Sequence, residues 1–417
     1  MNSSTILYII LGIIIFDFVL EKILDFLNLS YAQKGLPKSL EGIYEQEEYN
    51  RSISYQRTNL TFSMVSSTFN LVLTLVVLST GLFGWLNEWL SAYIGNQLML
   101  SLIFFGFVFV LSDLLNIPFS LYKTFVIEEK FGFNKITPKL FVADKIKGLL
   151  LTIIIGGIVL GTLLYLILEI GQNFWIYFWV FISVLMLLVN MFYTSLIVPL
   201  FNKLTPLEDG ELRNSIEAYS QKTGFKLDNI FVIDGSKRST KSNAYFSGIG
   251  KKKKIVLYDT LIANHTSEEL VSVLAHEVGH FKKKHIISGL ILSIGQLGAI
   301  LFLLSWFIFN PEISKALGSN TWAVHLNLIA FGILFSPISE IIGIIMNLIS
   351  RKNEFEADSY AAETYSAEPL MAALRKLSVK NLSNLNPHPA YVFMHYSHPP
   401  LSQRLENLQK HLMQQTV

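Results

Sequence analysis

The chain has 417 residues, of which 51% are hydrophobic and only 15% are charged, and its net charge is +2. Soluble domains carry about 25% charged residues, so this deficit and the mean hydropathy of +0.45 predict a membrane protein. The nearly balanced charge argues against a nucleic-acid partner. The chain has no cysteine, which excludes a thiol nucleophile and a cysteine-bound metal. Metal ligands must therefore come from His, Asp and Glu.

Seven runs are long and apolar enough to cross a bilayer, which takes about 20 residues. They are Ile6–Phe26, Leu60–Leu86, Leu98–Leu121, Leu149–Ile170, Phe174–Leu200, Ile286–Phe309 and Ala323–Ile349. Three runs contain an acid, Asp17, Asp113 or Glu340. Such acids either face a bundle interior or a water-filled cavity, or lie near a helix end and reach the interface. The first five residues carry no Lys or Arg, so we expect the first run to be a retained helix, not a cleaved signal peptide.

Lys and Arg are concentrated in alternate connections. The connections after the first, third and fifth runs, and the tail beyond Arg351, are rich in these basic residues, mostly Lys. The other connections are nearly bare, because 87–97 and 169–173 carry none and 310–322 carries only Lys315. The positive-inside rule then predicts a multi-pass protein with its N-terminus outside and its C-terminus in the cytoplasm. The pattern suits a bacterial inner membrane or an endoplasmic reticulum equally.

Two segments read as folded structure outside the membrane, and they divide the chain into four regions. Residues 1–200 hold five spans with cytoplasmic loops, 201–285 form a cytoplasmic segment, 286–350 hold two spans, and 351–417 form a cytoplasmic C-terminal segment. Periodicity predicts a helix at Leu207–Thr223 and short strands at Asn229–Ile233, Asn243–Phe246 and Lys254–Tyr258. Further helices are expected at Pro369–Lys376 and Pro400–His411, joined by a loop with several histidines. The fold class is therefore mainly α, integral to the membrane, with a small β-sheet.

The sequence from His276 to His280 reads H-E-x-x-H. Residues four apart share a helix face, so His276 and His280 can present two imidazoles to one metal ion. Glu277 can reach a water held there and act as its general base, as in zinc proteases. Thr266, with Glu269 three residues later, predicts a capping box at the start of this helix. The five-residue pattern by itself also occurs by chance.

A catalytic zinc ion needs a third protein ligand and an open position. Glu354 is the best candidate, because it follows the last span on the same side of the membrane. Asp358 shares its helical face and could hydrogen-bond a ligand imidazole, whereas Glu356 should point elsewhere. The alternative is that these acids only begin an exposed helix, where acids are favoured.

His398 and Arg404 are candidate donors to the oxyanion of the reaction, and Tyr396 is a weaker one. A lone histidine in a C-terminal loop more often lies at the surface or caps a helix. We expect the other isolated histidines to lie at the surface or to cap a helix. They are His265, His285, His325 and His411.

Four motifs together resemble the type I CaaX prenyl endopeptidase family. They are Phe125–Lys135, Ser242–Phe246, Ser350–Asp358 and Tyr396–Pro400 with Arg404, and they accompany the H-E-x-x-H sequence. The resemblance implies seven helices in a barrel around a water-filled chamber, with a gluzincin-like zinc protease domain at its cytoplasmic end. It implies one Zn²⁺ per chain held by His276, His280 and Glu354, with Glu277 as base and with His398 and Arg404 facing the substrate or its oxyanion. It also implies that Asn243, Ala244, Tyr245 and Phe246 form an edge strand on which a peptide lies extended.

The expected activity is hydrolysis of a peptide bond by zinc-activated water, with CaaX-type processing of prenylated peptides as the leading role. The partners would be a peptide or protein substrate, with or without a prenyl group, and membrane lipid, but no nucleic acid. One alternative is a membrane quality-control zinc protease that needs no prenyl group. A remote alternative is a transporter in which the zinc ion is structural, although such an ion would need a fourth protein ligand.

Overall fold

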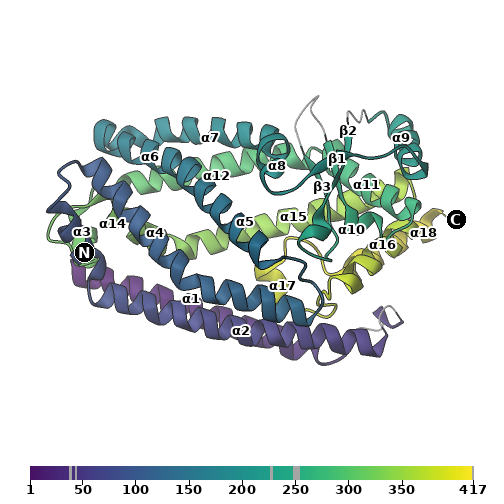
Figure 1. Cartoon of the computed structure of the whole chain (residues 1–417), viewed down its shortest axis with the longest axis horizontal. Helices are drawn as coiled ribbons and strands as arrows, with labels where there is room; N and C mark the ends of the chain where they lie inside the picture. Colours follow the sequence, from purple (N-terminus) through teal and green to yellow (C-terminus); the bar gives the residue numbers. More distant parts are fainter. Residues whose placement is uncertain (37–39, 43–44, 226–228, 248–253, 416–417) are drawn as a thin grey trace.

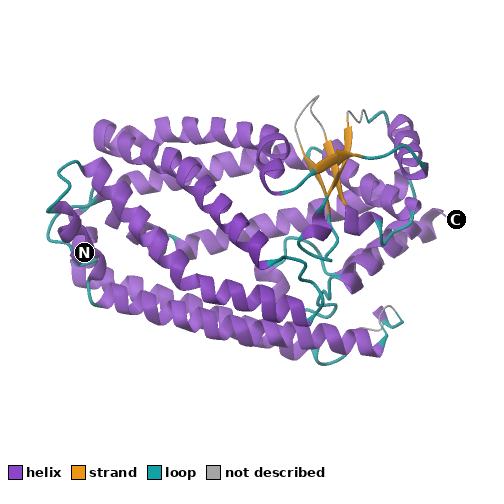
Figure 2. Cartoon of the chain, viewed as in Figure 1, coloured by secondary structure: helices purple, strands orange, loops and turns teal. Residues whose placement is uncertain are grey.

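The computed structural model describes residues 1–36, 40–42, 45–225, 229–247 and 254–415. Long helices run along the molecule, and one small sheet lies near the end that carries the C-terminus (Figures 1 and 2). The N-terminus lies at the opposite end (Figure 1). The two ends of the chain are therefore separated by the length of the helices.

Each of the seven predicted apolar runs is largely helical. The helices that carry them are α1 Ser3–Ala32, α2 Gln46–Ser79, α4 Gln97–Tyr122, α5 Pro138–Leu151, α6 Gly157–Ile170, α7 Phe174–Phe192, α12 His285–Phe307, α14 Val324–Leu334 and α15 Ser336–Thr364. The π-helical turns η2 Lys123–Glu128, η3 Thr152–Gly156 and η5 Tyr193–Ile197, and α8 Val198–Phe201, extend some of them. Among the described residues, five helices have the length and composition to cross a membrane, or six if α14 and α15 form one bent span.

This count is lower than the seven predicted spans because one continuous run, Pro138–Phe201, is counted once although it is 64 residues long. A straight helix of that length would measure about 96 Å, roughly three times the hydrocarbon core of a bilayer. The 3₁₀ turn η4 Gly171–Asn173 divides it, and α6 and α7 pack against each other on either side of that turn. The run therefore contains the fourth and fifth predicted spans.

Two predicted span boundaries are wrong. The second run was expected to reach Leu86, but α2 ends at Ser79. The next helix, α3 Leu82–Ser91, starts after Gly81. The backbone of Gly81 has a φ of +70°, which a right-handed helix cannot contain. The last run was expected to be one helix, but it bends by 51° between α14 and α15. Pro337, at the start of α15, lacks the amide that would extend the ladder of α14.

Apart from α14, which is more buried, the membrane helices lie mostly at the surface: at most 17% of the residues in the apolar window of each of the five candidate spans are inside the structure. A solid bundle would bury a stripe along each helix, so this low burial agrees with helices arranged around a hollow. Two of the three predicted acids in these helices have partners. Asp113 forms an ion pair of 2.6 Å with Lys145 of α5, and Asp17 accepts a hydrogen bond from Ser336. Pairing lowers the cost of a polar group at such a depth.

The sheet has the strand order β1-β2-β4-β3. Its strands are β1 Leu204–Pro206, β2 Asn229–Ile233, β3 Ala244–Ser247 and β4 Lys254–Tyr258. β2 and β4 are parallel, and the outer pairs are antiparallel. β1 was not predicted, because three residues that end in a proline carry no periodic pattern. β3 lies at an edge of the sheet and so can offer its outer backbone groups to another chain.

Six helices form in the two segments predicted to lie outside the membrane: α9 Glu211–Thr223, α10 Asp259–Ile262, α11 Ser267–Lys282, α16 Ala367–Lys380, α17 Pro389–His395 and α18 Leu401–Gln415. α9, α11, α16, α18 and the last turns of α15 share one buried apolar core with β2 and β4. The segment between α16 and α18 was predicted to be a loop, but its centre forms the helix α17. Pro389 occupies the first position of that helix.

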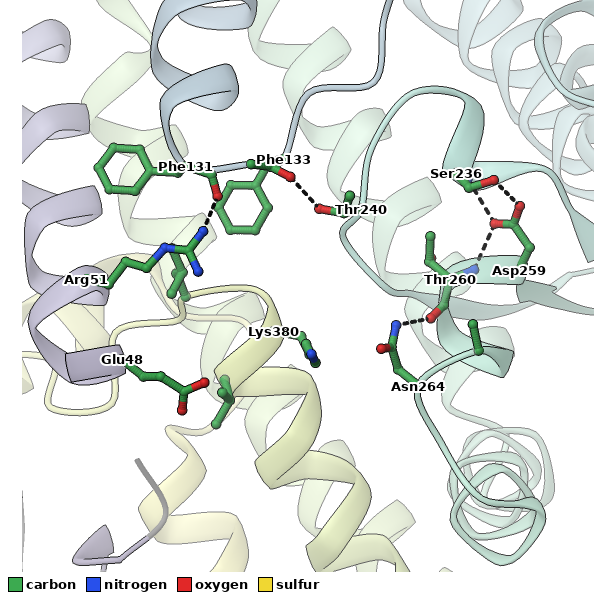
Figure 3. Close-up of a pocket in the computed structure, with 14 residues that line it drawn as sticks. Glu48, Arg51, Phe131, Phe133, Ser236, Thr240, Asp259, Thr260, Asn264 and Lys380 are labelled. Atoms are coloured by element: carbon green, nitrogen blue, oxygen red, sulfur yellow. Dashed lines mark hydrogen bonds between the residues drawn. The ribbon is translucent and has the colours of Figure 1, made fainter. Parts of the chain in front are cut away.

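The motif Phe125–Lys135 holds the segment that leads into β3. Glu128 accepts hydrogen bonds from Tyr55 and Lys241, at 2.7 and 2.9 Å. The backbone of Thr240 donates to Phe133, and Phe133 packs against Tyr55. Figure 3 shows the neighbouring cavity of about 600 Å³, which lies between α2, this motif, α10 and α16. None of the predicted site residues lines it, so the motif acts as a support for the edge strand.

Candidate active site

α11 carries the H-E-x-x-H sequence and begins as predicted. The Thr266 hydroxyl accepts a hydrogen bond from the Glu269 backbone, and the Glu269 carboxylate accepts one from the Thr266 backbone. Lys376 of α16 also pairs with Glu269 at 2.7 Å. These contacts fix the first turn, since they satisfy amide groups that a helix start leaves free. The helix then presents His276, Glu277 and His280 along its second half.

α15 brings the two predicted acids to α11, and Gly279 lets the helices approach closely (Figure 1). A Cβ atom on Gly279 would lie 3.0 Å from the Cα atom of Ala357. Glu354 and Asp358 flank Ala357 and lie beyond the midpoint of α15, where they are only 4% and 0% exposed. The interpretation that these acids merely begin an exposed helix is therefore wrong.

His276, His280 and Glu354 form a compact group of donor atoms that fits a metal ion. The Nε2 atoms of the histidines are 3.2 Å apart, and each lies close to one oxygen of Glu354: His276 is 3.5 Å from Oε2 and His280 is 3.2 Å from Oε1. A tetrahedral ion about 2.0–2.1 Å from each donor would separate its ligand atoms by about 3.3 Å. The Oε2 atom of Glu354 is buried, and within the described ranges its nearest charged neighbours, His276 and Arg404, each lie 3.5 Å away. This is the only group of three or more such residues in the described ranges.

Asp358 and Arg404 contact the donor group formed by His276, His280 and Glu354. Asp358 accepts two hydrogen bonds from Arg404, at 2.6 and 2.9 Å, and its Oδ1 lies 2.9 Å from the Nδ1 atom of His276. The remaining Arg404 nitrogen, Nη1, lies 3.5 Å from Glu354. The guanidinium is thus engaged mainly by carboxylates, whereas the sequence suggested that it faces the oxyanion.

The charges in this buried cluster shift the pKa values of its members. Burial alone would lower the pKa of His276, but hydrogen bonds to Asp358 and Glu354 raise it to about 9. Burial would raise the pKa of Glu354, but hydrogen bonds to His276 and His280 and the charge of Arg404 hold it well below its usual range. In the metal-free protein the cluster therefore keeps an ionised carboxylate and a protonated His276 at neutral pH.

A pocket of about 300 Å³ opens in front of the cluster. Glu277, His398 and Arg404 line it together with Asn243 and Ala244 from the edge of the sheet. The His398 side chain is 65% exposed, and its Nε2 atom lies 3.3 Å from Glu354. A molecule in the pocket can therefore meet His398 and Glu277 directly. The opposite wall is apolar and comes mainly from α16, through Leu370, Ala373, Leu374 and Leu377.

The four residues predicted for substrate binding do not all face this pocket. Side chains alternate along a strand, so Ala244 faces the pocket while Tyr245 packs on the other face, against Val198, Ile233 and Val256. Only the backbone of Tyr245 could meet a peptide at this edge. The backbone of Phe246 pairs with Ile255, and the side chain of Phe246 lies outside the described residues.

Sequence reasoning missed two residues next to the cluster. His285, assigned to the surface or a cap, is 9% exposed, and its Nδ1 atom lies 3.1 Å from the Nδ1 atom of His280. Its Nε2 atom lies 3.2 Å from Glu356. Glu356 points away from the ligand group, as predicted, but toward this histidine. The spacing of five residues between His280 and His285 hid the contact, since it does not share a helix face.

The helices and the site together define a class of protein. A largely helical membrane region is joined to a small sheet, an edge strand and an H-E-x-x-H helix, with a buried glutamate from a second helix completing the metal group. This is the construction of a membrane-embedded metalloprotease.

Comparisons with known proteins identify the family. Residues 25–203 match the family described as CAAX prenyl protease N-terminal, five membrane helices, and residues 206–412 match peptidase family M48. A CAAX prenyl protease 1 homolog from Arabidopsis thaliana is 37% identical over 95% of this chain and 96% of its own length. CAAX prenyl protease 1 from Saccharomyces cerevisiae is 38% identical, over 96% and 94%. The crystal structure of S. mikatae Ste24p has a TM-score of 0.91 and 38% identity, and covers 98% of this chain and 100% of that one.

The chain belongs to peptidase family M48, with the N-terminal membrane region of the CAAX prenyl proteases. It is a multi-pass membrane metalloendopeptidase whose substrates are peptides or proteins. The family predicted from the four motifs is confirmed, and so is the fold class. This result favours a protease over the transporter alternative.

Proposed function

We propose that the protein is a zinc endopeptidase that processes C-terminal CaaX sequences, and that His276, His280 and Glu354 hold one Zn²⁺ per chain. The single observation that carries the proposal is the three-residue donor group beside Glu277, in which one ligand atom from each residue lies within 4.8 Å of the others. Two imidazoles and one carboxylate are a donor set that suits zinc in proteases. A bound zinc ion supplies Lewis acidity toward a water and toward the scissile carbonyl.

In this proposal the chain's own groups carry the proton transfers. Glu277 takes a proton from the attacking water and passes it to the leaving amine, so it acts first as base and then as acid. His398, exposed in the pocket, donates a hydrogen bond to the oxyanion that develops on the scissile carbonyl. Arg404 acts through Asp358 and Glu354, which it keeps ionised and oriented.

The substrate lies extended along the outer edge of β3, with backbone hydrogen bonds to Asn243–Phe246. The relatives are named CAAX prenyl proteases, which motivates a prenylated C-terminal peptide as the substrate here. The division of the chain into four regions and the cytoplasmic orientation of the site belong to the proposal. The termini at opposite ends of the molecule support an odd number of crossings (Figure 1).

Paired peptides test the substrate class. Purified protein is incubated with a farnesylated CaaX peptide and with its unprenylated twin, and the products are identified by mass spectrometry. We expect cleavage at the CaaX cysteine and a higher kcat/KM for the farnesylated peptide. Equal kcat/KM values for the twins would contradict the prenyl preference and favour the quality-control alternative. Equal cleavage rates with and without a chelator would contradict the proposal that catalysis needs a metal ion.

The pH dependence of zinc binding follows from the pKa of His276. Zinc must displace a proton from His276 below the pKa of about 9, so we expect the apparent affinity to rise about tenfold per pH unit and to level off above pH 9. The same raised pKa stabilises the metal-free fold fully below the unfolded value of 6.5, and this stabilisation is lost as the pH rises toward 9. Zinc competition titrations between about pH 6 and 9.5 measure the affinity, and melting temperatures of the metal-free protein over the same range measure the stability. A zinc Kd that does not change from pH 6.5 to 9 would contradict the assignment.

A further inference from the structure

We propose that His285 and Glu356 form a hydrogen-bonded relay that orients His280 toward the metal and raises its basicity. The inference rests on the proposed function, because it assumes that His280 is a metal ligand. It assigns a role to two residues that the proposed mechanism does not use. The relay runs from the Glu356 carboxylate through both nitrogens of His285 to the Nδ1 atom of His280.

With a metal ion on the Nε2 atom of His280, the contacts admit one arrangement of protons that satisfies all of them. The Nε2 atom of His280 faces His276 and Glu354, so a metal takes this lone pair and leaves the ring proton on Nδ1. That Nδ1–H then donates to the Nδ1 atom of His285, at 3.1 Å. His285 must therefore carry its proton on Nε2, which donates to Glu356 at 3.2 Å. Both histidines are neutral in this arrangement, and the carboxylate at the end is ionised.

The backbone is shaped to make this contact. α11 ends at Lys282 and α12 starts at His285, and between them Lys284 has a φ of +62°, which is left-handed and rare for a residue with a side chain. A continuous helix would turn His285 away from His280, because residues five apart point in different directions. The left-handed turn instead brings the two rings to a centroid distance of 5.2 Å in an edge-on arrangement.

The relay gives each metal-binding histidine a partner of its own. Asp358 contacts the Nδ1 atom of His276 directly, and His285 does the same for His280. Glu356 is the more exposed end, and Lys352 lies 3.8 Å from its other oxygen. Because His285 is the first residue of α12, the relay also ties the site to a membrane helix. Partners of this kind typically change metal affinity by about 10–100-fold when they are removed.

Zinc affinity of the full-length protein in detergent, measured by competition with a chromogenic chelator after metal removal, tests the proposal. We expect His285→Leu to weaken zinc binding by about 10–100-fold, because Leu neither accepts nor donates a hydrogen bond. Glu356→Gln should weaken it less, and His285→Gln should recover some of the loss, since an amide can accept from His280 and donate to Glu356. A purely structural role of His285 would instead lower the melting temperature of the metal-free protein and leave its zinc Kd unchanged.

Two matched controls sharpen the result. Glu363 lies on the same helix and is exposed, so Glu363→Gln should keep the wild-type zinc Kd. Lys352→Gln removes the other neighbour of Glu356 and should change the Kd by less than about twofold. A His285→Leu protein that binds zinc within about twofold of wild type would overturn the relay while leaving the zinc site intact. Failure of the wild type to bind zinc would instead overturn the proposed function.

Discussion

Replacing Glu277 with Gln is expected to lower kcat for peptide cleavage by about 10²–10⁴-fold while zinc stays bound. Glu277 lines the pocket beside the donor group but does not belong to it. The amide keeps the shape and loses the capacity to take and return a proton. Product formation by mass spectrometry and zinc content by elemental analysis are measured on the same preparation.

Two comparisons make the Glu277 result specific. Glu277→Gln should bind a substrate peptide with about the wild-type affinity, because the substitution leaves β3 and the donor group unchanged. Glu354→Gln should lose cleavage together with zinc, because it replaces a metal-binding carboxylate. Full activity of the zinc-loaded Glu277→Gln protein would refute the proposed chemistry.

Replacing Asp358 with Ala is expected to cause the largest loss of stability among single changes at the site, about 3–5 kcal/mol. Asp358 is fully buried and holds Arg404 through two hydrogen bonds. Its removal leaves a buried guanidinium whose remaining carboxylate neighbour, Glu354, lies at 3.5 Å. The freed His276 also loses the partner that orients its ring. Thermal unfolding in detergent should show a much lower melting temperature, with weaker zinc binding.

An exposed ion pair and a double variant serve as controls for Asp358. Glu312→Gln breaks a solvent-exposed pair with Lys315 and should leave the melting temperature almost unchanged. Removing Asp358 and Arg404 together, as Asp358→Leu with Arg404→Leu, should cost less than the sum of the single changes, since neither member of the pair is left without the other. An unchanged melting temperature for Asp358→Ala would show that the buried pair does not hold α15 and α18 together.

Much of the fold could be predicted because its signals are local. A run of apolar residues predicts a membrane helix wherever it lies, and the Thr266–Glu269 capping box was found at its predicted position. The strands β2 and β4 have their predicted bounds, because a short apolar run between polar stretches needs no distant partner to be recognised. The bend at Pro337 could have been anticipated from the proline, but its angle depends on how α14 and α15 pack.

The sequence by itself determined the chemistry of the protein: an H-E-x-x-H helix, an acid-rich segment after the last span and a membrane setting. Tertiary structure alone decided how those residues are used. It turned Arg404 toward Asp358, put the Tyr245 ring on the far side of the sheet and brought His285 to His280. The physical reason is that periodicity reports only neighbours on one element, whereas burial and pairing join residues that are far apart in the chain. Asp358 and Arg404 are 46 positions apart, and nothing in the residues between them predicts that they meet.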